Sequence, residues 1–177
     1  MSVCCLDIPP SEYTRLANHL IRPRSKSEEA AFVFCEVRQS DARMELRFLK
    51  SYLIPAEGFT YRSLYGLELT DSCRASVIKR AHDLDACLLE WHSHPRASTV
   101  EFSASDRSGF ADFVPHVWWR LKKKPYGAVV VGPQNFDSLC WIANVNRPDG
   151  VLELQVGKRR LAPTGLTLEH WDLAYEF

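Results

Sequence analysis

The sequence lacks an excess of charge of either sign. Its 22 lysine and arginine residues balance 22 aspartate and glutamate residues, so the formal net charge is zero. A protein that binds nucleic acid through general electrostatics needs a basic excess. We therefore expect no nucleic-acid partner. The short basic runs "RLKKK" (120–124) and "GKRR" (157–160) are typical of solvated faces or helix ends.

The sequence also lacks long apolar runs. No stretch approaches the roughly 20 apolar residues that cross a bilayer. The first residues, "MSVCCLDIPPSEY", lack the apolar centre of a signal peptide. We therefore expect a cytoplasmic protein with no membrane partner.

No Cys-x-x-Cys pair is present, which argues against a cysteine-ligated zinc finger or ribbon. The six cysteines are scattered, and several lie in apolar runs where a reduced cysteine acts as a small hydrophobic residue. They are Cys4, Cys5, Cys35, Cys73, Cys87 and Cys140.

Linkers, internal repeats and low-complexity tracts are absent too, so we expect a single domain over residues 1–177. Apolar patterns predict helices over 9–23, over 69–85 and after residue 103, the last with an interruption near Pro115. Strands are predicted over 30–39, 43–55, 86–91, 126–132, 137–145 and 151–156. Residues 166–177 fit a strand or a closing helix. The interleaving predicts an α/β fold in which helices flank a single mixed β-sheet.

The segment "LLEWHSHPRASTVEFSASD" (88–106) holds the residues best suited to chemistry. In an extended chain residues i and i+2 face the same way, so His92 and His94 can converge while Ser93 turns away. Pro95 keeps His94 extended. Asp106 follows on a predicted helix, and two imidazoles with one carboxylate are a ligand set for catalytic zinc.

Each half of this segment also has a plain structural explanation. A His-x-His pair on a loop is usually solvent-exposed. Ser103 and Asp106 in "SASD" match a helix-capping arrangement, with the serine as cap and the acid near the positive end of the helix dipole. The metal-site interpretation therefore depends on the order of all the parts: apolar strand, His-x-His-Pro, spacer, then Ser-x-x-Asp opening a helix.

That order resembles the JAMM motif of the MPN-domain zinc metalloproteases. The family pattern is an upstream glutamate, then His-Ser/Thr-His-Pro, then Ser-x-x-Asp. The resemblance covers roughly residues 11–156 and implies the MPN, cytidine-deaminase-like, architecture. The matching residues here are Glu29, His92, Ser93, His94, Pro95, Ser103 and Asp106.

The resemblance implies that His92, His94 and Asp106 bind Zn²⁺, although the residues alone fix only a divalent ion. Glu29 would be the general base that takes a proton from water and passes it to the leaving amine. Ser103 would donate a hydrogen bond to the developing oxyanion. Two other glutamates remain candidates for the base. Glu28 is adjacent and would face the opposite way on a strand, and Glu90 lies two residues before His92.

The same resemblance implies an isopeptidase that removes a ubiquitin-like protein from its conjugates or processes its precursor. The compact chain is similar to stand-alone bacterial members, which act beside activating- and conjugating-enzyme homologues, sometimes in antiphage defence. Two alternatives stay open: a metallopeptidase for small peptides or a sulfur-carrier protein, and a non-catalytic scaffold. A nucleobase deaminase is excluded, because that chemistry needs His-x-Glu followed by Pro-Cys-x-x-Cys.

Overall fold

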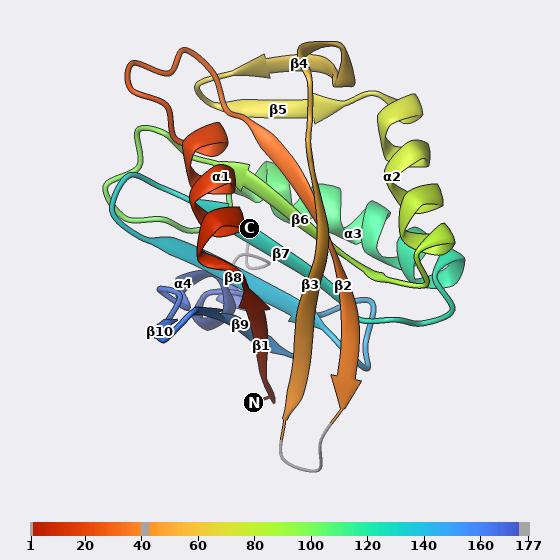
Figure 1. The fold of residues 1–177 in the computed structure, drawn as a ribbon. Coiled ribbons are helices and arrows are strands. Elements are labelled where there is room, and N and C mark those ends of the chain that lie inside the picture. Colours follow the sequence, from red (N-terminus) through yellow and green to blue (C-terminus); the bar gives the residue numbers. More distant parts are fainter. Residues whose placement is uncertain (1, 40–42, 174–177) are drawn as a thin grey trace.

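The chain folds into a closed, mixed β-barrel (Figure 1). The computed structural model describes residues 2–39 and 43–173. Seven strands form the ring in the order β1-β3-β2-β6-β7-β8-β9, and a parallel pairing of β1 with β9 closes it. Their bounds are β1 Ser2–Ile8, β2 Ala30–Gln39, β3 Met44–Leu53, β6 Cys87–Ser93, β7 Tyr126–Val131, β8 Phe136–Trp141 and β9 Gly150–Val156.

The expected fold class, a single sheet flanked by helices in the MPN arrangement, is therefore wrong. The strand that overturns it is β1, which the sequence analysis did not assign to any element. β1 pairs in parallel with β3 on one side and with β9 on the other, from Ser2↔Gly150 to Ile8↔Val156. A sheet whose two edges meet in this way has no open edge in the ring, so it forms a barrel.

In the described part of the chain, four helices and a hairpin lie outside the ring. They are α1 Pro10–Leu20, α2 Asp71–Asp83, α3 Ala104–Arg120 and α4 Leu166–Glu169, with the hairpin β4 Phe59–Ser63 and β5 Gly66–Leu69. A short 3₁₀ turn, Ala56–Gly58, leads into β4, and β10 Arg159–Leu161 extends the sheet beyond β9. Within residues 2–39 and 43–173, no helix combines the length and the apolar character needed to cross a bilayer.

Most of the predicted elements are confirmed, with one break that does not occur. α3 runs through Pro115 without interruption, although proline lacks the N–H that an interior helical position donates. The described part of the ambiguous C-terminal segment contains the short helix α4, and residues 174–177 lie outside the described residues.

Two buried clusters meet at the barrel wall. The inner cluster takes residues from all seven ring strands and from α1, and Trp91 is its largest side chain. The outer cluster lies between the wall and α2, α3 and α4, and contains Phe32 and Tyr126. Neighbouring residues on one strand therefore belong to different clusters, since side chains alternate across the wall. This alternation decides which residues of β2 and β6 reach the candidate site.

Candidate metal centre

β6 carries both histidines to the outer side of the barrel wall. His92 is opposite Ala30 of β2 and Val130 of β7, two members of the outer cluster. The backbone N–H of His94 donates to the carbonyl of Val131 at 2.8 Å, which fixes His94 just beyond the end of β6. The two imidazole rings lie 5.1 Å apart between centroids. The predicted convergence of the two histidines is confirmed.

Ser103 and Asp106 form a capping box at the start of α3, as the structural explanation of "SASD" predicted. The Asp106 N–H donates to Ser103 Oγ at 3.1 Å, and the Ser103 N–H donates to Asp106 Oδ2 at 2.7 Å. The Ser103 hydroxyl also donates to Oδ2 at 2.7 Å. These bonds satisfy two of the free N–H groups that begin every helix. They also fix the direction of the Asp106 carboxylate.

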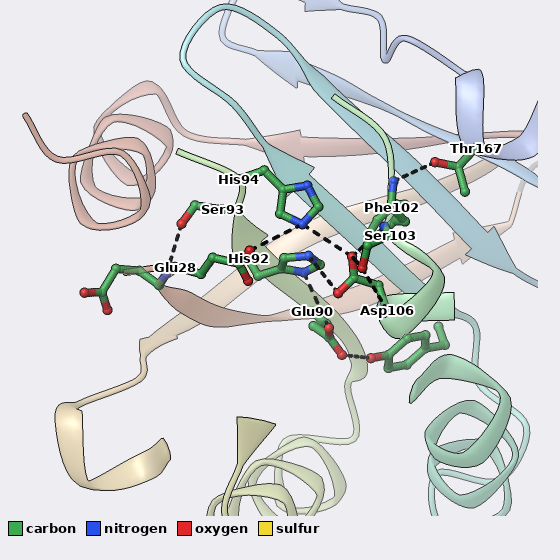
Figure 2. A network of polar contacts seen from close by, with 11 residues as sticks. Glu28, Glu90, His92, Ser93, His94, Phe102, Ser103, Asp106 and Thr167 are labelled. Atoms are coloured by element: carbon green, nitrogen blue, oxygen red, sulfur yellow. Dashed lines mark hydrogen bonds and ion pairs between the residues drawn. The ribbon is translucent and has the colours of Figure 1, made fainter. Parts of the chain in front are cut away.

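His92, His94 and Asp106 come together at one point (Figure 2). Asp106 Oδ1 lies 3.4 Å from His92 Nε2, and Oδ2 lies 3.3 Å from His94 Nε2. One ligand atom from each residue falls within 4.8 Å of the others, so the group could hold a metal ion. Both histidines thus present Nε2 toward a carboxylate that the helix cap orients.

The burial of the group is graded. The His92 side chain is only 2% exposed, whereas those of His94 and Asp106 are 16% and 18% exposed. The site is therefore closed on the His92 side and open to solvent on the side of the other two residues. A small molecule can approach from that open side.

Charge pairing holds this group together when no metal contributes. Burial by itself lowers the pKa of His92, but the Asp106 and Glu90 carboxylates raise it to about 10. Burial likewise raises the pKa of Asp106, but His92, His94 and Ser103 hold it well below its usual range. A bound cation takes over the role of the protons in such a cluster, because metal ligands must be deprotonated.

The donor set fits a divalent metal. Neither ring nitrogen of His92 makes a hydrogen bond within the described parts of the chain, although both are buried. Buried polar atoms without partners are rare in folded proteins. A metal on Nε2 would satisfy one of them and leave the proton on Nδ1. Two imidazoles and one carboxylate with an open side are the protein ligands of catalytic zinc sites.

The two adjacent glutamates before β2 have different partners. Glu28 is 3% exposed, and its Oε1 lies 3.8 Å from His94 Nε2, while its Oε2 has no hydrogen-bond partner among the residues described. Glu29 instead accepts from Arg62 of β4 at 2.6 Å. Ala30 is opposite His92, so alternation puts residue 28, not residue 29, on the face of the histidines. The geometry favours Glu28, one of the alternatives, for a role at the metal.

Ser93 and Glu29 fasten β6 to the segment that carries Glu28. The Ser93 N–H donates to the Glu29 carbonyl at 3.0 Å, and the Glu29 N–H donates to Ser93 Oγ at 2.9 Å. Ser93 is fully buried, and its hydroxyl is directed to the Glu29 N–H rather than to the ligand candidates. Ser93 therefore has a structural role, since these two hydrogen bonds fix the distance between Glu28 and His94.

Glu90 forms a second layer behind His92 (Figure 2). Its Oε1 lies 3.7 Å from His92 Nδ1, and its Oε2 accepts from the buried Tyr126 hydroxyl at 2.8 Å. Carboxylates behind a histidine ligand commonly fix its tautomer and orientation. The signal for this role was present in the sequence, because Glu90 is two residues before His92 and so shares its face of the strand.

A polar support under the loop between the two halves of the motif was not foreseen. The Phe102 N–H donates to Thr167 Oγ1 at 2.9 Å, and the Thr167 hydroxyl donates to Asp137 Oδ2 at 2.6 Å. Asp137, on β8, is fully buried. It thus anchors α4, which holds the residue next to Ser103. This support joins residues that are 30 and 65 positions apart, so no local sequence pattern predicts it.

A small cavity of about 90 Å³ adjoins the triad between β5 and α3. Its walls include Leu67 and Leu69 of β5, Gly109 and Phe113 of α3, and the ligand candidates His92 and Asp106. This volume is well below the roughly 300–1,000 Å³ of a typical small-molecule pocket.

No protein-family model matches this chain, and no curated protein matches it in sequence.

Proposed function

We propose that this chain is a zinc-dependent metalloisopeptidase of the kind that the JAMM-like motif implies. It would hydrolyse the bond after the C-terminal tail of a ubiquitin-like protein, in deconjugation or in precursor processing. The observation that carries the proposal is the convergence of Glu28 with His92, His94 and Asp106 on one outer face of the barrel. This convergence, rather than the fold class, supports the resemblance.

The roles follow from the contacts. His92, His94 and Asp106 would hold zinc, which when bound polarises a carbonyl and lowers the pKa of water toward neutrality. Glu28 would accept the proton from water and return it to the leaving amine. Burial raises the pKa of Glu28, although the two imidazoles oppose the shift, and a raised carboxyl pKa suits proton transfer near neutral pH.

Two further residues would assist. Ser103 would donate a hydrogen bond to the developing oxyanion, for which its hydroxyl must leave Asp106 Oδ2. Glu90, itself held by Tyr126, would keep the proton of His92 on Nδ1 and so leave Nε2 free to bind the metal. Glu90 is in this sense a positioning residue.

The shape of the site supports a substrate with small residues at the cleaved bond. The cavity beside His92 and Asp106 is small, about 90 Å³, and would suit a small side chain. An extended tail of small residues can reach such a site where a folded chain cannot. We propose that the partners are a ubiquitin-like protein and homologues of activating and conjugating enzymes. All six cysteines are free, which suits a cytoplasmic location.

The first experiment measures the metal content of the purified chain by elemental mass spectrometry. Asp106→Ala is prepared beside Asp112→Ala, which removes an exposed carboxylate from the same helix. We expect near-stoichiometric zinc in the wild type and in Asp112→Ala, and little in Asp106→Ala. Equal zinc in the two variants would contradict the ligand assignment.

The second experiment incubates the zinc-loaded chain with linear fusions and lysine conjugates of ubiquitin-like proteins, and follows cleavage by mass spectrometry. Cleavage directly after the tail is the expected result. Zinc without cleavage of any fusion or conjugate would refute the isopeptidase proposal and favour small peptides as substrates. A folded chain without metal would refute the enzyme and favour a scaffold.

A further inference from the structure

A second and larger cavity, of about 540 Å³, lies at one mouth of the barrel. α1, the loop between β7 and β8, and β10 surround it, and Trp91 of β6 forms part of its wall. α1 and that loop lie on the same side of the barrel in Figure 1. The volume is within the range of small-molecule sites, roughly 300–1,000 Å³, and barrel mouths are common places for them.

Two buried polar atoms in this wall have no partner among the described residues. They are the indole N–H of Trp91, a side chain that is 1% exposed, and Oδ1 of Asn135. Both residues line the cavity, one from β6 and one from the loop after β7. Buried polar groups are nearly always hydrogen-bonded. An unsatisfied N–H donor and an unsatisfied amide oxygen in the wall of one cavity therefore indicate a ligand with complementary groups.

The charge of the cavity wall is positive. Arg159 and Arg160 of β10 line it, and no acidic residue does. Arg160 forms an ion pair with Glu153, whereas no described side chain pairs with Arg159. These arginines belong to the "GKRR" run, which the sequence analysis assigned to a solvated face or a helix end, and both are exposed. The fold brings one uncompensated guanidinium to the same cavity as the Trp91 N–H.

We propose that this cavity binds a small organic anion. Its carboxylate or phosphate accepts hydrogen bonds from Trp91 and Arg159, and a hydroxyl or amine group on it donates to Asn135. Apolar contacts with Tyr13 of α1 and Leu161 of β10 complete the site. The ligand lies on the inner side of the strand whose outer side carries His92. This proposal does not depend on the metalloisopeptidase function.

The test is isothermal titration calorimetry with two matched pairs of probes. AMP and adenosine test a phosphate, and N-acetyltyrosine and its amide test a carboxylate. The proteins are the wild-type chain, Trp91→Phe, Arg159→Gln, Lys158→Gln and, to disable the metal centre, Asp106→Ala. Lys158→Gln is the matched control, because it removes one charge from the adjacent position, which does not line the cavity.

We expect at least one of the two anions to bind saturably, and its uncharged partner at least tenfold more weakly. Arg159→Gln should weaken the anion at least tenfold and Lys158→Gln should not, while Trp91→Phe should abolish the ligand-induced change in tryptophan fluorescence. Binding that persists in Asp106→Ala excludes the metal centre as the site. No saturable binding up to millimolar concentrations, or equal binding to the two charge variants, overturns the proposal.

Discussion

The two faces of the wall formed by β2 and β6 differ in what their polar groups lack. On the outer face, carboxylates and imidazoles converge. Some of their own nitrogen and oxygen atoms have no hydrogen-bond partner among the described residues. On the inner face, the buried indole N–H of Trp91 belongs to the wall of a cavity that Arg159 also lines, and neither group has a side-chain partner among the described residues. The outer set is Glu28, Glu90, His92 and His94, and the inner set is Trp91 with Arg159.

The difference teaches that one strand can serve two sites of opposite preference. The outer face offers electron pairs and suits a cation, whereas the inner face offers N–H donors and suits an anion. Alternation along the strand is enough to keep the two sets apart, because consecutive side chains cross to opposite sides of the wall. Trp91 and His92 are neighbours in the sequence and belong to different sites.

The largest expected effect tests the outer face, by substituting each of the two adjacent glutamates in turn. Glu28→Gln should keep zinc and lower the turnover by about 10²–10⁴-fold, because a glutamine cannot accept the proton from water. Glu29→Gln should leave turnover near the wild-type rate, because its carboxylate is engaged with Arg62. Steady-state kinetics on a cleavable fusion, normalised to zinc content, measures both.

The opposite result is equally informative. If Glu29→Gln abolished turnover and Glu28→Gln did not, then Glu29, the residue that the motif alignment selects, would be the base. The ion pair with Arg62 would then have to open during the reaction. The same substitution at adjacent positions controls for the loss of one negative charge near the site.

The second test concerns the layer behind His92. Glu90→Gln and Tyr126→Phe should each weaken zinc binding by about 10–100-fold, because residues that orient a ligand histidine typically contribute that much. Competition with a chromophoric chelator measures the affinity. The absorption spectrum of the cobalt-substituted protein should shift in Glu90→Gln, which a loss of stability alone would not produce. An unchanged affinity in both variants would show that Glu90, in the middle of β6, does not position His92 for the metal.

Much of the site could be predicted from local spacing, and the fold class could not. The His-x-His pair, the proline after it and the helix cap at Ser103 act over a few residues, and the structure has them as expected. The barrel depends on β1 pairing with β9, almost the whole chain apart. The alternation of Cys4, Leu6 and Ile8, all fully buried, was a local signal for β1 that could have been used.

The choice between Glu28 and Glu29 also depends on long-range pairing, which local patterns do not predict. Alternation states that only one of them can face the histidines, but not which one. The answer needs the register of β2 against β6, in which Ala30 is opposite His92. A register is set by contacts across the sheet, so a shift by one residue would reverse the choice.

A third prediction uses the charge pairing of the metal-free site. The pKa of His92 is raised to about 10, so its contribution to stability is fully present below pH ~6.5 and is lost as pH rises toward 10. The zinc-free protein should therefore lose free energy of unfolding across this range, with a slope of up to about 1.4 kcal/mol per pH unit. Urea unfolding at several pH values measures it.

His92→Gln should flatten this slope, because the variant has no imidazole to titrate at this position. Saturating zinc should remove the slope as well, since the metal requires the neutral ring and replaces the proton. A steep slope that persists in His92→Gln would assign the effect to other groups. This test distinguishes the cation-seeking outer face from ordinary titration of the rest of the chain.

The smallest expected effect separates the two roles of Ser103. As the cap of α3 it should contribute about 1 kcal/mol to stability, so Ser103→Ala should lower the free energy of unfolding by that amount. Thr70→Ala is the matched control, because Thr70 caps α2 by accepting from the Cys73 N–H at 3.0 Å.

Both alanine variants should be destabilised alike, but only Ser103→Ala should also slow turnover at full zinc occupancy. Its kcat should fall less than that of Glu28→Gln, because the hydroxyl is shared with Asp106. Equal kcat values for Ser103→Ala and Thr70→Ala would leave Ser103 with the cap alone. The oxyanion would then depend on the metal and on backbone N–H groups.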